Sequence, residues 1–191
     1  METLRKKVKI LIDMDGILVD LCTKWLEVYN EEYGDSLTQG DFTAWDWRVD
    51  AKPGSDPHSI IKRPGFFDDL PPLPGAVDGF KELYRSHHDV IVASSPAGPD
   101  SARAKMEWCE KYLGVGKEDV SLTYHKSWFA GSCDVIVDDK PETLREWSHR
   151  GKDAYTIAYP FNAKAQDCCA FVAHDYTDTQ AAWEQIVKAL L

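Results

Sequence analysis

The sequence of 191 residues predicts an α/β fold, in which a parallel sheet carries helices on both faces and a small, mainly helical cap follows the first strand. Two observations lead to this prediction. Short apolar runs alternate with stretches of helical periodicity, which is typical of a parallel sheet buried between two helical layers. Residues 20–70 interrupt this alternation with irregular sequence that contains Pro, Gly and many aromatic residues. We therefore expect a Rossmann-like core at 1–19 and 71–191 and a cap at 20–70.

The first strand is predicted at residues 8–13, and it ends in two closely spaced carboxylates. Asp13 and Asp15 are separated by one residue, and Gly16 then permits a sharp turn. Ligands bind beyond the carboxyl ends of the strands in an open α/β sheet. Two like charges this close are costly unless a cation shares them, and a hard cation such as Mg²⁺ suits carboxylate oxygens. An ordinary strand-to-turn junction is the alternative, because Asp is common in turns.

The remaining elements follow from apolar periodicity and from Gly and Pro signals. Residues 71–75, with the sequence PPLPG, form a stiff connector back to the core. Further strands are expected at 89–93, 120–124, 134–137 and 153–158, and helices at 20–33, 76–86, 101–113, 142–150 and 178–191.

Polar side chains stand at four of the predicted strand ends. The ends of parallel strands converge on one edge of the sheet, so we expect these groups to meet. Together they suit phosphoryl transfer, in which one carboxylate attacks phosphorus and a second moves the proton. A divalent cation offsets charge, while hydroxyl and ammonium groups hold the phosphate oxygens. In chain order the groups are Asp13 and Asp15, Ser94 and Ser95, Lys126, and Asp138 and Asp139.

The segments DMDGILVD, VIVASSP and DVIVDDKP, with Lys126 between the last two, resemble the four motifs of the haloacid dehalogenase superfamily of phosphatases. Within that superfamily, the chain is similar to the 5′(3′)-deoxyribonucleotidases through these motifs and through FFDDLPPLPGAV at 66–77. The resemblance implies a Mg²⁺-dependent phosphoric monoester hydrolase of the 5′-nucleotidase type. Its substrates would be nucleoside monophosphates, with deoxyribonucleotides favoured, and its intermediate an aspartyl phosphate.

The resemblance also implies a role for each motif residue. Asp13 is expected to be the nucleophile, and Asp15 the general acid and base. The carboxylate of Asp13 and the backbone carbonyl of Asp15 would contribute to the Mg²⁺ site. The pair Asp138 and Asp139 would complete it, with Asp139 favoured as the direct ligand and Asp138 behind it. The residues expected to bind phosphate are Ser94, Ser95 and Lys126.

The cap is where the resemblance is weakest, and it sets the substrate. Trp45 and Trp47 are the candidates to stack on a nucleobase, with packing inside the cap as the alternative for both. Tyr124 departs from the resemblance, because the family often carries a basic residue two positions before the motif lysine. A phosphate contact is then missing or supplied by Arg48. The same core chemistry acting on a sugar phosphate or another small phosphorylated metabolite is therefore the second hypothesis.

Two other function classes share parts of this pattern. A phospho-acceptor signalling domain also uses acidic, hydroxyl and lysine groups at strand ends. Such a domain lacks a cap and carries its acceptor on the third strand, whereas the acidic pair here follows the first. A haloacid dehalogenase proper is disfavoured, because Asp15 suits protonation of a phosphate-ester leaving group.

Composition limits the possible binding partners and the cellular compartment of the protein. The net charge of −10 argues against a nucleic-acid polymer but not against a small phosphorylated substrate. Five cysteines without a metal-binding spacing indicate free thiols in a reducing compartment rather than a zinc site. No apolar run reaches membrane-spanning length, and no apolar signal region precedes the first strand, so we expect a cytoplasmic protein without a membrane partner. The oligomeric state stays open, with a homodimer as one option.

Overall fold

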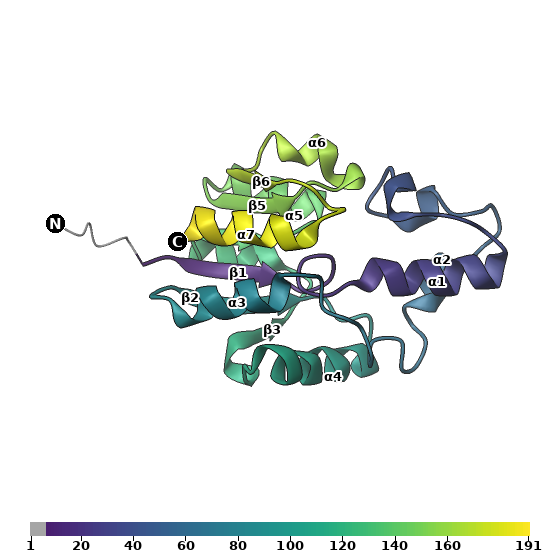
Figure 1. Cartoon of the computed structure of the whole chain (residues 1–191), viewed down its shortest axis with the longest axis horizontal. Coiled ribbons are helices and arrows are strands. Elements are labelled where there is room, and N and C mark those ends of the chain that lie inside the picture. The colour runs from purple at the N-terminus through teal and green to yellow at the C-terminus, as the bar shows by residue number, and fades with distance from the viewer. Residues whose placement is uncertain (1–6) are drawn as a thin grey trace.

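The computed structural model describes residues 7–191 and contains one parallel six-stranded sheet (Figure 1). Residues 1–6, which the prediction places in the core, lie outside the described residues. The strand order is β3-β2-β1-β4-β5-β6. Strand β1 therefore lies inside the sheet, with β2 and β3 on one side of it and β4, β5 and β6 on the other. The strands are β1 (Lys9–Asp13), β2 (Asp89–Ser94), β3 (Val120–Leu122), β4 (Val135–Val137), β5 (Asp153–Ile157) and β6 (Phe171–Ala173).

The structure confirms the α/β class and the five predicted strands, and it adds β6. This strand has three residues, lies at the edge of the sheet and keeps two of its side chains partly exposed. Its sequence therefore lacks the continuous apolar run that identifies a central strand. The prediction of five strands was wrong by this one element.

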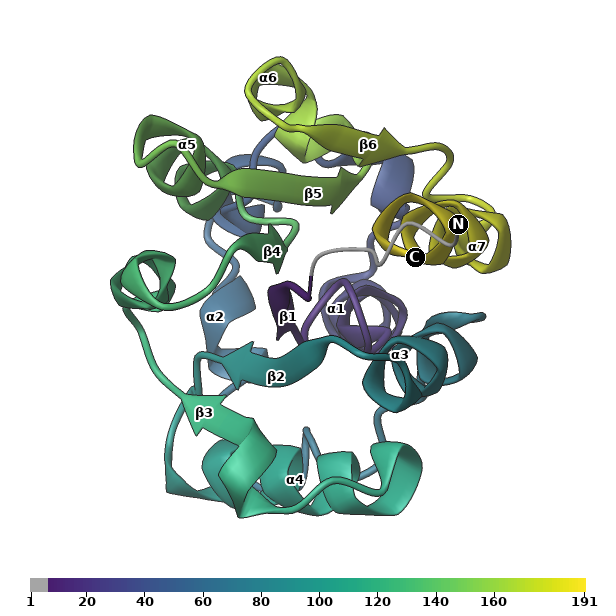
Figure 2. The ribbon, with the colours of Figure 1, turned by 90° about the vertical axis from the view of Figure 1, so that its left-hand side faces the viewer.

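Helices cover both faces of the sheet, as expected for parallel strands. Figure 2 shows α3 and α7 on one face and α5 on the other. Side chains of β1 alternate between these faces: Ile10 and Ile12 join the cluster that contains Phe80 of α3, whereas Leu11 joins the cluster of α5. The helices are α1 (Leu21–Tyr33), α2 (Pro57–Ile60), α3 (Ala76–Arg85), α4 (Pro99–Trp108), α5 (Pro141–His149), α6 (Ala163–Gln166) and α7 (Thr179–Leu190).

The segment at 20–70 lies beyond the carboxyl ends of the strands, where α1 and α2 extend away from the sheet (Figure 1). Helix α1 begins after Asp20, whose carboxylate accepts the backbone N–H of Thr23, and it ends at Gly34, whose φ of 56° is the left-handed conformation that glycine adopts readily. Trp25 is fully buried, and its indole nitrogen donates to the carbonyl of Pro57 at 3.0 Å.

Two connectors join this segment to the sheet and run side by side. The N–H of Asp20 donates to the carbonyl of Pro71, and the N–H of Leu73 donates to the carbonyl of Leu18, both at 2.9 Å. The segment also shares a hydrophobic cluster with β1. We keep the division into a core and a cap at 20–70 as a proposal.

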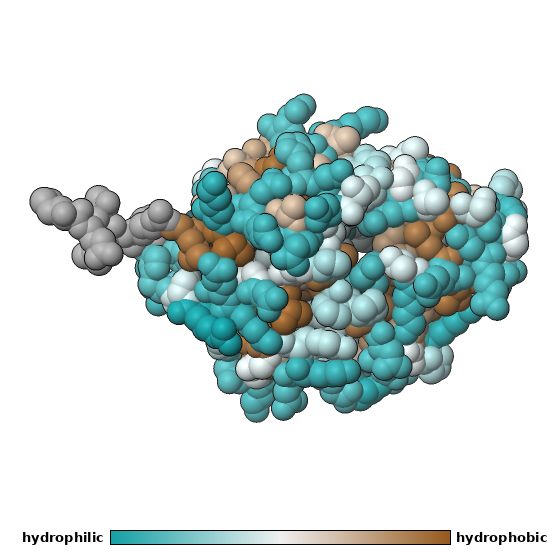
Figure 3. Space-filling view, in the orientation of Figure 1, coloured by the Kyte–Doolittle hydropathy of each residue, from teal (hydrophilic) through white to brown (hydrophobic). Residues whose placement is uncertain are grey.

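Hydrophilic residues cover most of the face seen in Figure 3, in keeping with the negative net charge. Between residues 7 and 191, no helix combines the length and apolar character needed to cross a membrane.

Candidate active site

The strand ends bring an ion-pair cluster together below the segment at 20–70. Lys126, at the start of the turn after β3, places its Nζ 2.6 Å from Asp13 Oδ1 and 2.8 Å from Asp138 Oδ2. All three side chains are buried. Burial raises the pKa of Asp13 to about 7, although the Lys126 ammonium acts in the opposite direction. Burial opposes the charge of Lys126, but the two carboxylates outweigh it and raise its pKa.

The neighbouring acids Asp138 and Asp139 differ in what they face. Asp138 is fully buried, and its two oxygens accept hydrogen bonds from the ammonium of Lys126 and the backbone N–H of Lys140. Asp139 instead lines a cavity. Burial and the charge of Asp13 raise the pKa of Asp139 well above its usual value. One carboxylate oxygen from each of Asp13, Asp138 and Asp139 lies within 4.8 Å of the others, an arrangement compatible with a bound metal ion.

Gly16 is required by the close approach of two chain segments. Its φ of 77° is a left-handed conformation, and a Cβ atom at this position would overlap Asp139 Oδ2. The hydroxyl of Tyr159 donates to the Gly16 carbonyl at 2.8 Å. The turn after β1 is thereby pressed against the carboxylate that follows β4.

Asp15 contacts a lysine that none of the sequence motifs contains. Lys105 of α4 is 1% exposed, and its Nζ lies 2.5 Å from Asp15 Oδ2 and 2.8 Å from Ser94 Oγ. Ser94 is fully buried and does not line the cavity, so its hydroxyl contacts Lys105 and not the place where we expect phosphate. Ser95 does line the cavity, with its hydroxyl donating to the Thr123 carbonyl at 2.9 Å.

The cavity has a volume of about 430 Å³ and lies between the strand ends and the segment at 20–70. Trp45 and Trp47 both line it. Trp45 is 44% exposed, and the Lys140 Nζ lies 4.2 Å from its ring centroid. Trp47 packs more deeply, with its ring 4.5 Å from that of Trp25 and 5.6 Å from that of Phe42. Trp47 therefore contributes to packing as well as to the cavity wall.

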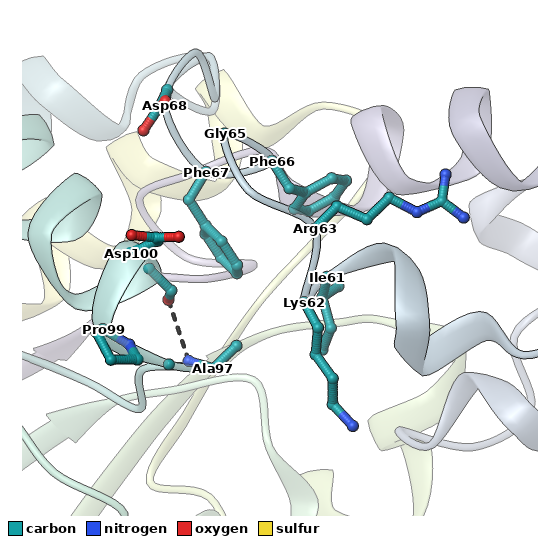
Figure 4. A pocket seen from close by; sticks show the side chains of 12 residues that line it. Ile61, Lys62, Arg63, Gly65, Phe66, Phe67, Asp68, Ala97, Pro99 and Asp100 are labelled. Carbon is teal, nitrogen blue, oxygen red and sulfur yellow. Dashed lines mark hydrogen bonds between the residues drawn. The ribbon is translucent and has the colours of Figure 1, made fainter.

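Phe67 joins the cavity to a smaller hollow of about 90 Å³ beside the start of α4. Figure 4 shows its ring lying between the chain at 61–66 and the turn at Ala97–Asp100. The Lys105 Nζ lies 4.9 Å from the centroid of this ring. Phe67 is thus in contact with both the cavity and the buried lysine.

A family model described as 5′ nucleotidase, deoxy (pyrimidine), cytosolic type C matches residues 6–189. The chain belongs to this nucleotidase family. A Bordetella bronchiseptica protein provisionally named a 5′(3′)-deoxyribonucleotidase is 30% identical over 169 residues, covering 83% of this chain and 87% of that protein. The human mitochondrial 5′(3′)-deoxyribonucleotidase is 29% identical over 160 residues, covering 75% of this chain and 69% of that protein.

Solved structures show the same fold at low sequence identity. A haloacid dehalogenase-like protein from Agrobacterium tumefaciens superposes with a TM-score of 0.63 at 14% identity, covering 97% of this chain and 99% of that one. A haloacid dehalogenase-like hydrolase from Streptococcus pneumoniae gives a TM-score of 0.58 at 12% identity, covering 92% and 97%. The nucleotidase is thus a phosphoric monoester hydrolase with the fold of haloacid dehalogenase-like proteins, which confirms the resemblance read from the motifs.

One sequence-based alternative finds no support in the folded nucleotidase. Arg48 does not line the cavity, because its guanidinium is held by Asp46, with Nε 2.9 Å from Oδ1. The position two residues before the motif lysine is filled by Tyr124, which lines the cavity and donates its hydroxyl to the Pro96 carbonyl. The structure thus gives no support to Arg48 as the substitute phosphate contact.

Lys105 is the site residue that sequence reasoning missed. It lies between Ala104 and Trp108 on the buried side of α4, so a signal was available. A lysine on the apolar face of a helix is costly to bury unless a carboxylate or another acceptor meets it. Nothing in the local sequence says which acceptor that is.

Proposed function

We propose that this nucleotidase is a Mg²⁺-dependent phosphatase that hydrolyses nucleoside monophosphates, deoxyribonucleotides among them, through an aspartyl-phosphate intermediate. The observation that carries the proposal is the pairing of Asp13 with Lys126 in a cavity that Trp45 and Trp47 also line. A carboxylate beside an ammonium, in a cavity with an aromatic lining, suits a ligand that carries a phosphate and a flat ring.

In the proposed reaction, a carboxylate oxygen of Asp13 attacks phosphorus and the bond to the ester oxygen breaks. The ester oxygen takes a proton from Asp15 and leaves as the nucleoside alcohol. Water then attacks the aspartyl phosphate and gives its proton to Asp15, which releases inorganic phosphate and restores both side chains. Lys126 holds a phosphate oxygen and stabilises the charge that redistributes over the transferring group.

The residues at the strand ends fit a divalent cation. Three buried carboxylates approach one another, and the Lys126 ammonium contacts Asp13 and Asp138. Carboxylate and carbonyl oxygens are the ligands that Mg²⁺ prefers. Asp13, the Asp15 carbonyl and Asp139 would hold the ion, with Asp138 fixing Lys126. When bound, Mg²⁺ would offset the repulsion between the nucleophile and the phosphate dianion.

Both tryptophans support a nucleobase as the second half of the substrate. Trp45 offers an exposed ring at the cavity wall, and stacking on an aromatic ring contributes about 1–3 kcal/mol per base.

A cytoplasmic location also stays a prediction. Its support is that the described cysteines are all free: Cys22, Cys109, Cys133, Cys168 and Cys169.

The deciding experiment compares kcat/KM across a panel of 5′- and 3′-deoxyribonucleoside monophosphates, ribonucleoside monophosphates and sugar phosphates, all with Mg²⁺. We expect nucleoside monophosphates to be preferred. Preference for a sugar phosphate over every nucleotide would overturn the substrate assignment while leaving the aspartyl-phosphate chemistry intact. Inactivity on every phosphomonoester would overturn both.

A further inference from the structure

Lys105 is a buried ammonium with three contacts, each of them to a different part of the active site. Its Nζ lies 2.5 Å from Asp15 Oδ2, 2.8 Å from Ser94 Oγ and 4.9 Å from the centroid of the Phe67 ring. A lysine ammonium has three N–H donors, so two oxygens and an aromatic face occupy it fully. Burying such a charge is expensive, and a hydrophobic side chain of similar volume would pack here at lower cost. The charge therefore calls for an explanation other than packing.

The two carboxylate oxygens of Asp15 differ in their hydrogen bonding. Oδ2 accepts the hydrogen bond from Lys105, whereas Oδ1 is buried and has no hydrogen-bond partner among the described residues. Asp15 also lines the cavity. A buried acceptor without a partner costs free energy, so such groups in native proteins usually have a specific role. Here the tethered oxygen fixes the carboxyl group, and the other oxygen keeps an unused capacity to form a hydrogen bond.

The tether is anchored to a rigid element. Lys105 stands in the middle of α4, and one turn later the indole nitrogen of Trp108 donates to the Leu70 carbonyl at 2.9 Å. This bond ties α4 to the chain returning from the segment at 20–70. A catalytic group is held most precisely when its support comes from a packed helix or strand rather than a loop. Asp15 itself lies outside the helices and the sheet, in an isolated β-bridge with Val19 after β1.

We infer that Lys105 is a positioning residue, which holds Oδ2 of Asp15 so that Oδ1 meets the ester oxygen of the substrate and later the attacking water. This inference rests on the proposed function, because it assigns Asp15 the proton transfers. Misplacing a catalytic group by about 1 Å can cost about 100-fold in rate. Positioned proton transfer contributes about 10²–10⁴-fold, and losing the tether should forfeit a part of this.

The test uses Lys105→Met, which removes the charge but keeps a long side chain, and Lys111→Met as the matched control at an exposed lysine near the same helix. We expect Lys105→Met to lower kcat for thymidine 5′-monophosphate about 10- to 100-fold, with KM changed less than about threefold. Lys111→Met should behave as the wild type. Circular dichroism and thermal unfolding check that both variants fold, and Lys105→Gln replaces Lys105→Met if the latter does not.

Two readouts separate positioning from a general loss of structure. p-Nitrophenolate leaves without a proton, so Lys105→Met mixed rapidly with p-nitrophenyl phosphate should release a burst of about one p-nitrophenolate per enzyme before slow turnover. Adding Lys105→Met to Asp15→Asn should lower kcat by less than about a further threefold, because both changes act on the same group.

Each outcome decides between the claims. Equal slowing of both substrates without a burst, a double variant that loses the product of the two single effects, or a fully active Lys105→Met would overturn the positioning role. A wild type that hydrolyses no nucleotide, or an Asp15→Asn variant at full rate, would instead overturn the proposed function.

Discussion

Truncating the two cavity tryptophans one at a time separates reading of the base from support of the fold. If Trp45 stacks on the nucleobase, Trp45→Ala removes about 1–3 kcal/mol of binding that the base receives, which is about a 5- to 150-fold loss in kcat/KM for thymidine 5′-monophosphate. p-Nitrophenyl phosphate depends on the strand-end residues, so its kcat/KM should change less than about threefold.

Thermal stability should depend more on Trp47 than on Trp45. Trp45 is 44% exposed and its ring meets the Lys140 ammonium, an interaction that contributes about 0.5–1 kcal/mol at exposed sites. Trp47 packs on Trp25 and Phe42, and each aromatic pair contributes about 0.5–1.5 kcal/mol beyond its buried area. Trp47→Ala should therefore lower Tm by about 2–12 °C, given about 2–4 °C per kcal/mol for a domain of this size, and Trp45→Ala by less than about 4 °C.

The assays are steady-state kinetics on both substrates and thermal unfolding of both variants against the wild type. A folded Trp45→Ala enzyme that loses both substrates equally would show that this ring supports the site without reading the base. A folded Trp45→Ala enzyme with unchanged nucleotide kinetics would assign base recognition elsewhere in the cavity. A Trp47→Ala variant as stable as the wild type would contradict the packing argument.

The remaining predictions concern the nucleophile, the metal and two glycines. Asp13→Asn should fold normally by circular dichroism and lose several orders of magnitude in kcat, each tenfold loss being about 1.4 kcal/mol, because an amide cannot act as the nucleophile. EDTA should remove activity and Mg²⁺ restore it, while Ca²⁺ binds but supports turnover poorly, since its looser coordination misplaces the nucleophile. Gly16→Ala should weaken activation in a Mg²⁺ titration by at least about tenfold, because its Cβ overlaps Asp139 and its φ is positive. Gly79→Ala should lower the free energy of unfolding by about 1–3 kcal/mol in a urea titration, because its Cβ would lie 2.6 Å from a ring carbon of Trp183 in α7.

Each of these expectations has a result that would contradict it. A near-normal kcat in folded Asp13→Asn would refute the nucleophile assignment, and full activity in a metal-free preparation would refute the metal requirement. Unchanged Mg²⁺ activation in Gly16→Ala would show that the turn yields without moving Asp139. Equal stability of Gly79→Ala and the wild type would mean that α7 shifts at no cost.

The meeting of the residues at the strand ends was predictable, because parallel strands have their carboxyl ends at one edge of the sheet. Asp13 and Lys126 lie far apart in the sequence, yet their atoms are 2.6 Å apart in the structure. The sequence alone left Asp138 and Asp139 almost equivalent as ligands. The structure distinguishes them, because both oxygens of Asp138 are occupied by Lys126 and Lys140 while Asp139 lines the cavity.

By itself, the sequence determined the α/β class, five of the six strands, the acidic pair after the first strand and the nucleotidase family. These features depend on local periodicity and on groups at the ends of elements, which a linear pattern records directly. Tertiary structure alone decided that Lys105 of α4 meets Asp15 across 90 residues, that Ser94 faces this lysine, and that Arg48 is held by Asp46. The reason is that each side chain's partner is set by how a helix or cap segment packs against the sheet, and nothing in the neighbouring residues specifies that packing.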